Sequence, residues 1–376
     1  MKLRPALKRF RTQRGLTQQE LARLAGVSRQ ALNEVENGRS VPSTLIALQL
    51  ARSLGCRVEE LFQLDGAEES LRAVLAQPLR GPAGDSLRVV VAQVAGRWVA
   101  HRLDPTQRLG DLTLAADAVL VKPGARAGQA AFEPLVDERR LAETLLLAGC
   151  DPALGLLTDR AGRDNPGSRN VWLEASSGAA LSALARSEVH AAGAHLLEEA
   201  SGEYNVPFVR SAFAGRAMLL VTVAQIEEGL AVARGNPKRI RGVAQLARKG
   251  VRFMNREESA GARRLLDRLL RASGVSAATV DGYDRFAPGH REAAHAVASG
   301  AADAAMVTCA VALALGLDFV PLASERFDLA IPKEWIGDRR VTRLLDALAS
   351  GAFRRELASL GGYSTQRSGA IAAELQ

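Results

Sequence analysis

Residues 17–39, with the sequence TQQELARLAGVSRQALNEVENGR, constrain the fold of this chain more than any other stretch. Two short amphipathic segments there predict helices, joined by a tight turn at Ala25-Gly26-Val27. Thr17 and Ser28 precede the two segments, where a hydroxyl can accept a hydrogen bond from a free N–H of the first helical turn. Glu20 follows Thr17 by three residues, which completes a capping box. The apolar sides of the segments can meet, so the stretch predicts a helical hairpin.

The polar side of the second segment indicates a partner. It carries side chains that can hydrogen-bond base edges in a major groove, namely Arg29, Gln30, Asn33, Glu34 and Asn37. Residues 1–64 hold eleven Lys or Arg against five Asp or Glu, so about +6 of the chain's +8 charge lies in this segment. Localised positive charge is what binding to DNA phosphates requires.

The pattern extends beyond the hairpin and predicts five helices. It includes Leu7-Lys8-Arg9-Phe10-Arg11 before the hairpin and Val35-Glu36-Asn37-Gly38-Arg39 at its end, and it closes at Leu61-Phe62. This region resembles the helix-turn-helix domain of Cro and phage repressors, the Xre type. A helical protein-binding module is the alternative interpretation.

The resemblance implies a role for each matching residue and a double-stranded DNA operator as partner, bound by a homodimer. Gln18, Asn37 and Arg39 would bind backbone phosphates. Base edges would be contacted from the second helix, with Ser28 at its start, by Arg29, Gln30, Glu34 and Asn33.

Length and composition bound the rest of the chain. A chain of 376 residues predicts two or three domains, which we expect at 1–65, 66–138 and 139–376, with residues 65–69 ending the first. The three cysteines (Cys56, Cys150 and Cys309) form no CxxC pair, which is typical of a reducing cytoplasm. We find no apolar signal region and no apolar run of membrane-spanning length, so we expect a cytoplasmic protein with no membrane partner.

The segment 66–138 reads as a small β-rich connecting module. Strands are expected at 87–94, 97–103 and 118–121, with a turn at Ala95-Gly96 between the first two. We assign this module no chemistry. Trp98 is expected to be a packed aromatic side chain, and His101 a surface imidazole.

From residue 139 onward strands and helices alternate, which predicts an α/β domain. Strands are expected at 144–148, 170–174, 217–223, 251–254, 304–307, 317–321 and 327–331, and helices at 153–158, 179–185, 260–272 and 341–348.

Several phrases of this region together resemble one family. They are LAGCDPAL at 147–154, VHAAGAHL at 189–196, GEYN at 202–205, GNPK at 235–238, Asn255-Arg256, VASGAADA at 297–304 and LDFVPL at 317–322. The set is similar to the periplasmic-binding-protein-like domain of some regulators and molybdopterin-biosynthesis proteins, which is related to type II solute-binding and LysR effector domains. The resemblance implies two α/β lobes with a ligand in the cleft between them.

Candidate ligand-binding residues follow from the positions of turns that open helices, where backbone N–H groups can bind an anion. One turn supplies Ser176 and Ser177, and Gly149 and Asp151 would form its rim. The other turn, in the second lobe, supplies Asn255, Arg256, Ser259, Gly261 and Arg263. Tyr283 would line the cleft or pack its hinge. By the resemblance, the ligand would be a molybdate- or tungstate-like oxyanion or a molybdopterin-related compound.

Glu258 and Ala262 depart from the family phrase, which leaves altered or lost binding open. No cofactor is expected. His190 and His195 have no Cys or carboxylate at ligand spacing in the sequence, so no metal is expected either. There is no GxSxG motif, P-loop or nucleophile with a neighbouring base, so the chain is expected not to be an enzyme. An enzyme or accessory protein of molybdenum cofactor biosynthesis is one alternative to a ligand-sensing regulator. A DNA-binding protein with a ligand-free dimerisation domain is another.

Overall fold

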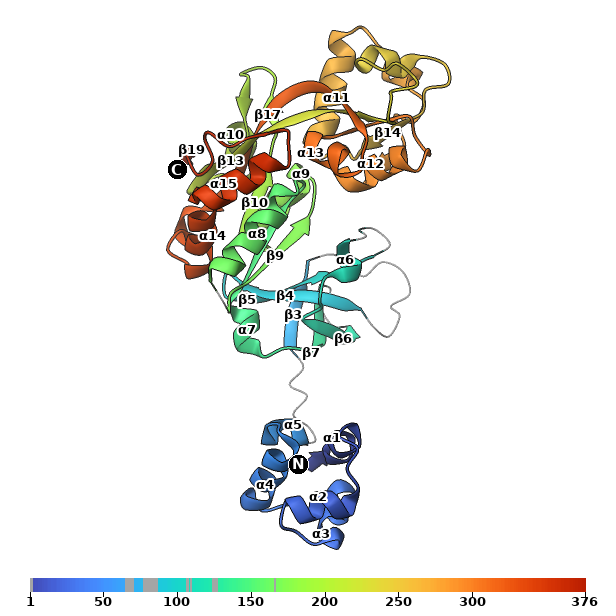
Figure 1. Ribbon diagram of the computed structural model, residues 1–376. Coiled ribbons are helices and arrows are strands. Elements are labelled where there is room, and N and C mark those ends of the chain that lie inside the picture. Colours follow the sequence, from blue (N-terminus) through green and yellow to red (C-terminus); the bar gives the residue numbers. More distant parts are fainter. Residues whose placement is uncertain are drawn as a thin grey trace. The chain divides into compact units, whose positions relative to one another are not determined.

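The computed structural model describes residues 3–64, 71–76, 87–105, 108, 110–123, 128–165 and 167–376 (Figure 1). The chain divides into two compact units, Met1–Leu71 and Arg72–Gln376. The expected domain end at residues 65–69 lies outside the described residues. The fold class predicted from sequence is confirmed: a helical N-terminal region precedes a two-lobed α/β domain.

The first unit contains the five predicted helices. They are α1 (Leu7–Gln13), α2 (Gln18–Leu24), α3 (Arg29–Glu36), α4 (Thr44–Leu54) and α5 (Val58–Leu61), and the short strands β1 (Leu3–Pro5) and β2 (Phe62–Leu64) pair antiparallel. Thr17 and Glu20 form the expected capping box, and the Ser28 hydroxyl accepts from Ala31 N. Gly26, in the turn, has a φ of +65°, which favours glycine.

The core of this unit is built from leucines on different helices, of which Leu7, Leu21, Leu50 and Leu61 are fully buried. Arg11 and Glu36 form a buried ion pair at 2.6 Å beside it.

The connecting module is a closed five-stranded barrel in the order β3-β5-β4-β6-β7. Its elements are β3 (Leu71–Leu75), β4 (Arg88–Val94), β5 (Arg97–Arg102), α6 (Gly110–Thr113), β6 (Ala118–Pro123) and β7 (Gln129–Pro134). Ala95 and Gly96 link β4 to β5 with positive φ values of 49° and 73°, as a two-residue hairpin turn requires. The predicted hairpin is therefore confirmed.

One prediction in the barrel is wrong. His101 is not a surface imidazole: it is buried, and its Nε2 lies 2.8 Å from Glu188 O, with burial lowering its pKa. The reason is that β4 and β5 pack against the α/β domain and share one core with it, through Val90 and Leu146 among others. Trp98 is half-buried.

A ten-stranded mixed sheet runs through both lobes in the order β15-β14-β16-β13-β17-β10-β8-β9, with β18 and β19 paired to β13. The first lobe contains α7 (Glu138–Ala142), β8 (Thr144–Gly149), α8 (Ala153–Asp164), β9 (Arg169–Glu174), α9 (Ser177–Ala185), β10 (Ala191–Ala194), β11 (Leu197–Glu198), β12 (Glu203–Tyr204) and α10 (Val206–Ala212). After the second lobe the chain returns to it with η3 (Lys333–Trp335), α14 (Arg339–Ala349), α15 (Gly351–Ser359), β18 (Tyr363–Ser364) and β19 (Ile371–Leu375). The core on one face of its sheet includes α8, α14 and α15, and the core on the other includes α9, α10 and the barrel.

The second lobe contains η1 (Val243–Ala247), β14 (Phe253–Arg256), α11 (Gly261–Ala272), η2 (Ala277–Thr279), β15 (Phe286–Ala287), α12 (His290–Ala298), β16 (Ala304–Thr308) and α13 (Cys309–Ala314). One of its two cores contains α11, and the other contains α12 and α13. Throughout the described part of the chain, no helix is long and apolar enough to cross a membrane.

Two long antiparallel strands, β13 (Met218–Val232) and β17 (Asp318–Pro332), join the lobes (Figure 1). Two predicted boundaries are wrong. The sequence predicted separate strands at 317–321 and 327–331, whereas β17 is one continuous strand. The sequence also predicted that the strand beginning at 217 ends at residue 223, whereas β13 continues to Val232. Polar residues such as Glu228 and Glu325 interrupt the apolar pattern in the middle of both strands. These two carboxylates are nevertheless fully buried, because the middle of each strand lies between the lobes.

Candidate functional site

The N-terminal unit presents the side chains predicted to contact DNA on and around α3. Ser28, Arg29, Gln30, Asn37 and Arg39 are exposed, whereas Gln18, Asn33 and Glu34 are half-buried. Asn33 Oδ1 accepts hydrogen bonds from Gln18 Nε2 (3.3 Å) and from Asn37 Nδ2 (2.9 Å). Gln18 also donates to Glu36 Oε2, at 2.8 Å. These contacts hold the amides in place, while Arg29 and Gln30 extend into solvent.

A second candidate site lies between the two lobes, where the carboxyl ends of parallel strands meet. From the first lobe, β8 leads to Cys150 and Asp151, and β9 leads to Ser176 and Ser177. From the second lobe, β14 ends in the fully buried Asn255 and Arg256. The predicted residues of both lobes therefore lie at facing sheet edges.

The lobes are in direct contact in this structure. Ser176 Oγ lies 2.7 Å from Ser259 Oγ, and Gly178 N donates to Ser259 O at 3.1 Å. A Cβ atom added to Gly261 would lie 2.4 Å from His195 O. The cleft is closed, and the closure depends on a glycine at position 261.

Asn255 and Arg256 are held from within the second lobe. Asn255 Oδ1 accepts from Arg256 N and its Nδ2 donates to Tyr283 O, both at 2.8 Å. Arg256 Nε donates to Ala287 O and to Glu257, each at 3.2 Å. Gly149 contributes backbone: its carbonyl accepts from Trp172 Nε1 at 2.8 Å. Ser177 is fully buried, and its Oγ accepts from His195 N at 3.2 Å.

Arg263 and Tyr283 form a cluster with each other. The Arg263 guanidinium stacks on the Tyr283 ring, 4.1 Å from its centroid, and pairs with Asp267 at 3.0 Å. The Tyr283 hydroxyl donates to Asp267 Oδ1 at 2.8 Å. The positive charge of Arg263 is thus already balanced by Asp267. The hydroxyls of Ser176 and Ser259 contact each other instead of this cluster.

Sequence reasoning overlooked a buried group of reactive side chains beside these residues. His195 Nε2 lies 3.2 Å from Cys150 Sγ, and His195 Nδ1 lies 2.8 Å from Glu325 Oε2. Glu228 Oε1 lies 3.8 Å from His195 Nδ1 and 3.7 Å from His290 Nε2. None of these five side chains is more than about 2% exposed. We call this group the cleft cluster: Cys150, His195, Glu228, His290 and Glu325.

The expectation that His195 has no cysteine or carboxylate partner was wrong. Its partners come from 45 and 130 positions away along the chain, which a search for local spacing does not find. A detectable indication was the pair Glu227-Glu228 inside the mainly apolar 15-residue segment MLLVTVAQIEEGLAV. In a strand, one of two adjacent side chains faces each side, so one of the two carboxylates had to face the apolar side.

Several buried polar atoms of this region have no hydrogen-bond partner among the residues that the structure describes. They are both carboxylate oxygens of Glu228, both ring nitrogens of His290, Asp151 Oδ2, Thr308 Oγ1 and Arg256 Nη1. Buried polar atoms in native proteins are nearly always paired, so such a concentration is typical of a place where a bound group supplies the partners.

Burial also shifts the titration of the cluster. It raises the pKa of Glu228 to about 7, with His195 opposing and Glu325 adding to the effect. Burial alone would lower the pKa of His195, but the Cys150 sulfur and the Glu325 and Glu228 carboxylates outweigh it and raise the pKa well above the usual imidazole value. For His290, burial, together with Arg256 and His195, lowers the pKa well below that value. Near neutral pH, His290 is therefore a neutral imidazole with free lone-pair capacity.

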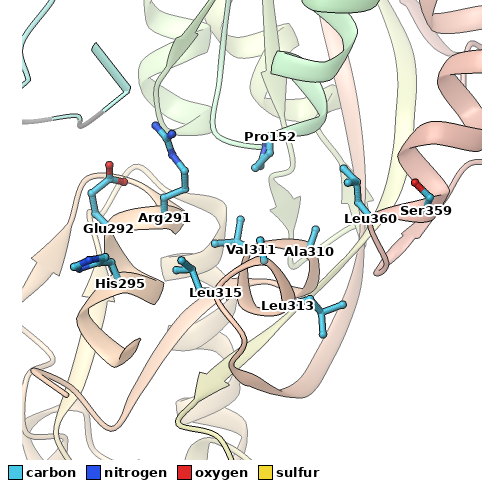
Figure 2. A pocket seen from close by; sticks show the side chains of 11 residues that line it. Pro152, Arg291, Glu292, His295, Ala310, Val311, Leu313, Leu315, Ser359 and Leu360 are labelled. Carbon is cyan, nitrogen blue, oxygen red and sulfur yellow. The ribbon is translucent and has the colours of Figure 1, made fainter. Parts of the chain in front are cut away.

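An open, mainly apolar groove of about 790 Å³ adjoins this region (Figure 2). Figure 2 shows that Pro152, Arg291 and Glu292 line it together with apolar side chains of α13 and with Leu360. Pro152 directly follows Asp151, and Arg291 directly follows His290, so the groove borders two elements that carry buried polar groups.

Comparisons with known proteins agree with this architecture. A family model described as a PBP superfamily domain matches residues 158–349, about half of the chain, and one described as helix-turn-helix matches residues 7–61. The uncharacterized protein YvgK of Bacillus subtilis is 36% identical over 180 residues, which cover 48% of this chain and 58% of YvgK. This chain thus spans little more than half of that relative's length.

An HTH-type transcriptional regulator of Methanothermobacter thermautotrophicus is 42% identical over 64 residues, 17% of this chain and 93% of the relative. Among solved structures, one described as a phosphate ABC transporter substrate-binding protein with bound phosphate, from Clostridium perfringens, has a TM-score of 0.45 at 12% identity, and the match covers 58% of this chain and 98% of that one. The chain therefore belongs to the PBP superfamily and carries at its N-terminus the helix-turn-helix domain of HTH-type transcriptional regulators.

Proposed function

We propose that this protein is a one-component transcription regulator: its helix-turn-helix domain binds an operator, and the cleft of its PBP-like domain binds a small ligand. The proposal that the cleft binds a ligand rests on the buried polar atoms between the closed lobes that have no hydrogen-bond partner in the described part of the chain. The exposed polar side chains of α3 and the net positive charge of residues 1–64 support the first half of the proposal, operator binding.

At the DNA, Arg29 and Gln30 would contact base edges, with Glu34 and Asn33 beside them. Gln18, Asn37 and Arg39 would bind phosphates, and Ser28 would cap the recognition helix. We propose a homodimer, because helix-turn-helix proteins of this kind contact two half-sites about one helical turn apart. Binding to an operator would occur in the cytoplasm.

Ligand binding would act through the two lobes. A ligand can shift the protein between open and closed lobes only if it binds one state better than the other. Ser176 and Ser259, which touch in the closed state, come from different lobes. A ligand that lies between their helices would therefore favour closure, and with it one arrangement of the DNA-binding domains.

For the ligand we propose first a small oxyanion, such as molybdate or tungstate, or a molybdopterin-related compound. Arg256 Nη1 and the hydroxyls of Ser176, Ser177 and Ser259 support an anion. Gly149, Asp151, Asn255 and Gly261 would complete the walls, and Arg263 and Tyr283 would take part only if they leave Asp267. The buried Asp151, Glu228 and Glu325 repel an anion, so it would have to enter with protons or with a cation.

The proposal is tested with the purified full chain on duplex DNA from its own upstream region. We expect retention that weakens steeply with salt and a footprint that changes with one added effector, with molybdate and tungstate assayed first. Ser176→Leu, which blocks the contact with Ser259, should remove the effector response and leave DNA binding intact. A chain that binds no duplex at any salt concentration contradicts the proposal. If DNA binds but no small molecule raises the melting temperature, the second domain acts in dimerisation alone.

One observation favours an enzyme as the second candidate. Contrary to the sequence-based expectation, a thiol and a base are adjacent: Cys150, His195 and Glu325 are aligned as in a nucleophile–base–carboxylate triad. The N-terminal domain is similar to a protein described as an HTH-type transcriptional regulator, which favours regulation over turnover. Rapid, stoichiometric acylation of Cys150 by an activated ester at neutral pH would support the enzyme, including one acting in molybdenum cofactor assembly.

A further inference from the structure

We propose that Cys150, His195 and His290 bind a divalent first-row transition-metal ion of the zinc class, with Glu325 as the residue that positions His195. This inference rests on the proposed function, because it names the class of ligand taken by the same cleft.

The distances fit one ion. Cys150, His195 and His290 each offer a ligand atom, and these atoms all lie within 4.8 Å of one another. The closest pair, Cys150 Sγ and His195 Nε2, is 3.2 Å apart. With metal–ligand bonds of 2.0–2.3 Å, ligand atoms of a tetrahedral zinc ion lie roughly 3.5 Å from each other. Small side-chain adjustments would therefore bring all three to one centre.

The orientation of His195 selects this trio. Metal-binding imidazoles characteristically donate their second N–H to a carboxylate, which fixes the ring. His195 Nδ1 lies 2.8 Å from Glu325 Oε2, so Nε2 is the nitrogen left for the ion, and it is the one that faces Cys150. The alternative trio of His195, Glu228 and Glu325 would require the ion to use Nδ1 and break this hydrogen bond.

Independent support comes from polar atoms that point into the cluster without partners. Among the described residues, both ring nitrogens of the 1% exposed His290 and both oxygens of the fully buried Glu228 lack a hydrogen bond. An ion would bind one His290 nitrogen. The Glu228 carboxylate, 3.7 Å from His290 Nε2, would balance the ion's charge or take the fourth ligand position.

The chemistry of the donors indicates the metal class. A thiolate and two imidazoles favour zinc and its neighbours in the first transition row over magnesium or calcium, which prefer oxygen ligands. Two positive charges near the cluster oppose a cation. The Arg256 guanidinium is paired with Glu257, and Arg268 Nη2 lies 3.9 Å from Glu325 Oε1. The Cys150 sulfur and the carboxylates of Glu228 and Glu325 supply the negative charge that would balance a bound cation.

Cobalt(II) is the probe that tests the site, since a cysteine ligand gives it an intense thiolate-to-metal absorption band. The metal-free full chain should bind one Co²⁺ with this band, and Zn²⁺ should displace it. Cys150→Ser should lose the band, whereas Cys309→Ser and Cys56→Ser, which change the other two cysteines, should keep it. Glu325→Gln should keep the band and weaken binding by about 10–100-fold, as loss of an orienting carboxylate does.

Equal bands in the Cys150→Ser variant and the wild type would overturn the proposal, as would a folded wild-type chain that binds no Co²⁺. Tryptophan fluorescence melting of each variant shows that it is folded, and His290→Ala provides a second loss-of-ligand variant that keeps the thiol. Duplex binding is measured on the same samples. DNA binding without Co²⁺ binding refutes only the metal site, and Co²⁺ binding without DNA binding refutes only the regulator.

Discussion

Glu228 contributes to the pH dependence of the metal-free protein's stability, and Glu228→Gln should remove that contribution. The Glu228 carboxylate is fully buried in the middle of β13, and neither oxygen has a hydrogen-bond partner among the described residues. Burial raises its pKa from 4.5 to about 7. Since a pKa unit corresponds to 1.36 kcal/mol, keeping this group ionised in the folded state costs about 3 kcal/mol.

Whether stability rises or falls with pH depends on which state, folded or unfolded, binds the Glu228 proton more tightly. The folded state keeps the Glu228 proton up to about pH 7, whereas the unfolded chain releases it near pH 4.5. The stability that this group contributes is thus fully present below pH 4.5 and is lost as the pH rises through 7. Between pH 5 and pH 8 the wild type should lose about 2–3 kcal/mol from this group, and Glu228→Gln should not.

Urea unfolding at pH 5 and pH 8, in the presence of a chelator, measures this difference. The three tryptophans (Trp98, Trp172 and Trp335) all belong to the second unit, so their fluorescence reports that unit alone. Glu227→Gln is the matched control, because Glu227 is the adjacent residue of the same strand but is exposed. The reasoning is refuted if the Glu228→Gln variant shows the same pH dependence of unfolding free energy as the wild type.

Two further predictions concern DNA binding and lobe closure. Arg29→Ala should weaken the free energy of operator binding by about 1–3 kcal/mol and relax selectivity at the base pair that Arg29 contacts. Fluorescence anisotropy with matched and mismatched duplexes measures both effects. The control is Arg52→Ala, which removes an exposed arginine of α4 and should leave selectivity unchanged. Gly261→Ala should prevent full closure, because the new Cβ would lie 2.4 Å from His195 O. An overpacking cost of about 1–3 kcal/mol makes Co²⁺ binding roughly 10–100-fold weaker. In the control Gly337→Ala, no atom of the residues that the structure describes lies within 4 Å of the new Cβ. Cobalt titrations that gave equal affinities for the two variants would contradict the closure argument.

The sequence predicted best what is determined locally. The caps at Thr17 and Ser28 and the turn at Ala95-Gly96 depend on neighbouring residues, and the structure has them as expected. Ser176 and Ser259 were selected for their positions before helices, but nothing local indicated that they would touch.

The features that sequence reasoning missed depend on which distant segments of the chain meet in the fold. The continuity of β17 was missed because its polar middle resembles a loop in sequence, although in the structure that part lies between the lobes. The cleft cluster was missed because Cys150, His195 and Glu325 come from three elements, and His101 was misjudged because a neighbouring domain covers it.

The two long strands also limit how the chain can change over evolutionary time. Successive side chains of a strand point to opposite faces, so a single-residue insertion or deletion before Glu228 in β13 would turn that carboxylate away from His195 and His290. The same holds for Glu325 in β17. Loops at the far ends of the lobes can vary in length without such an effect. Homologues that keep the chemistry of the cleft are therefore expected to keep the lengths of these two strands, residue for residue, even where the surrounding sequence has diverged.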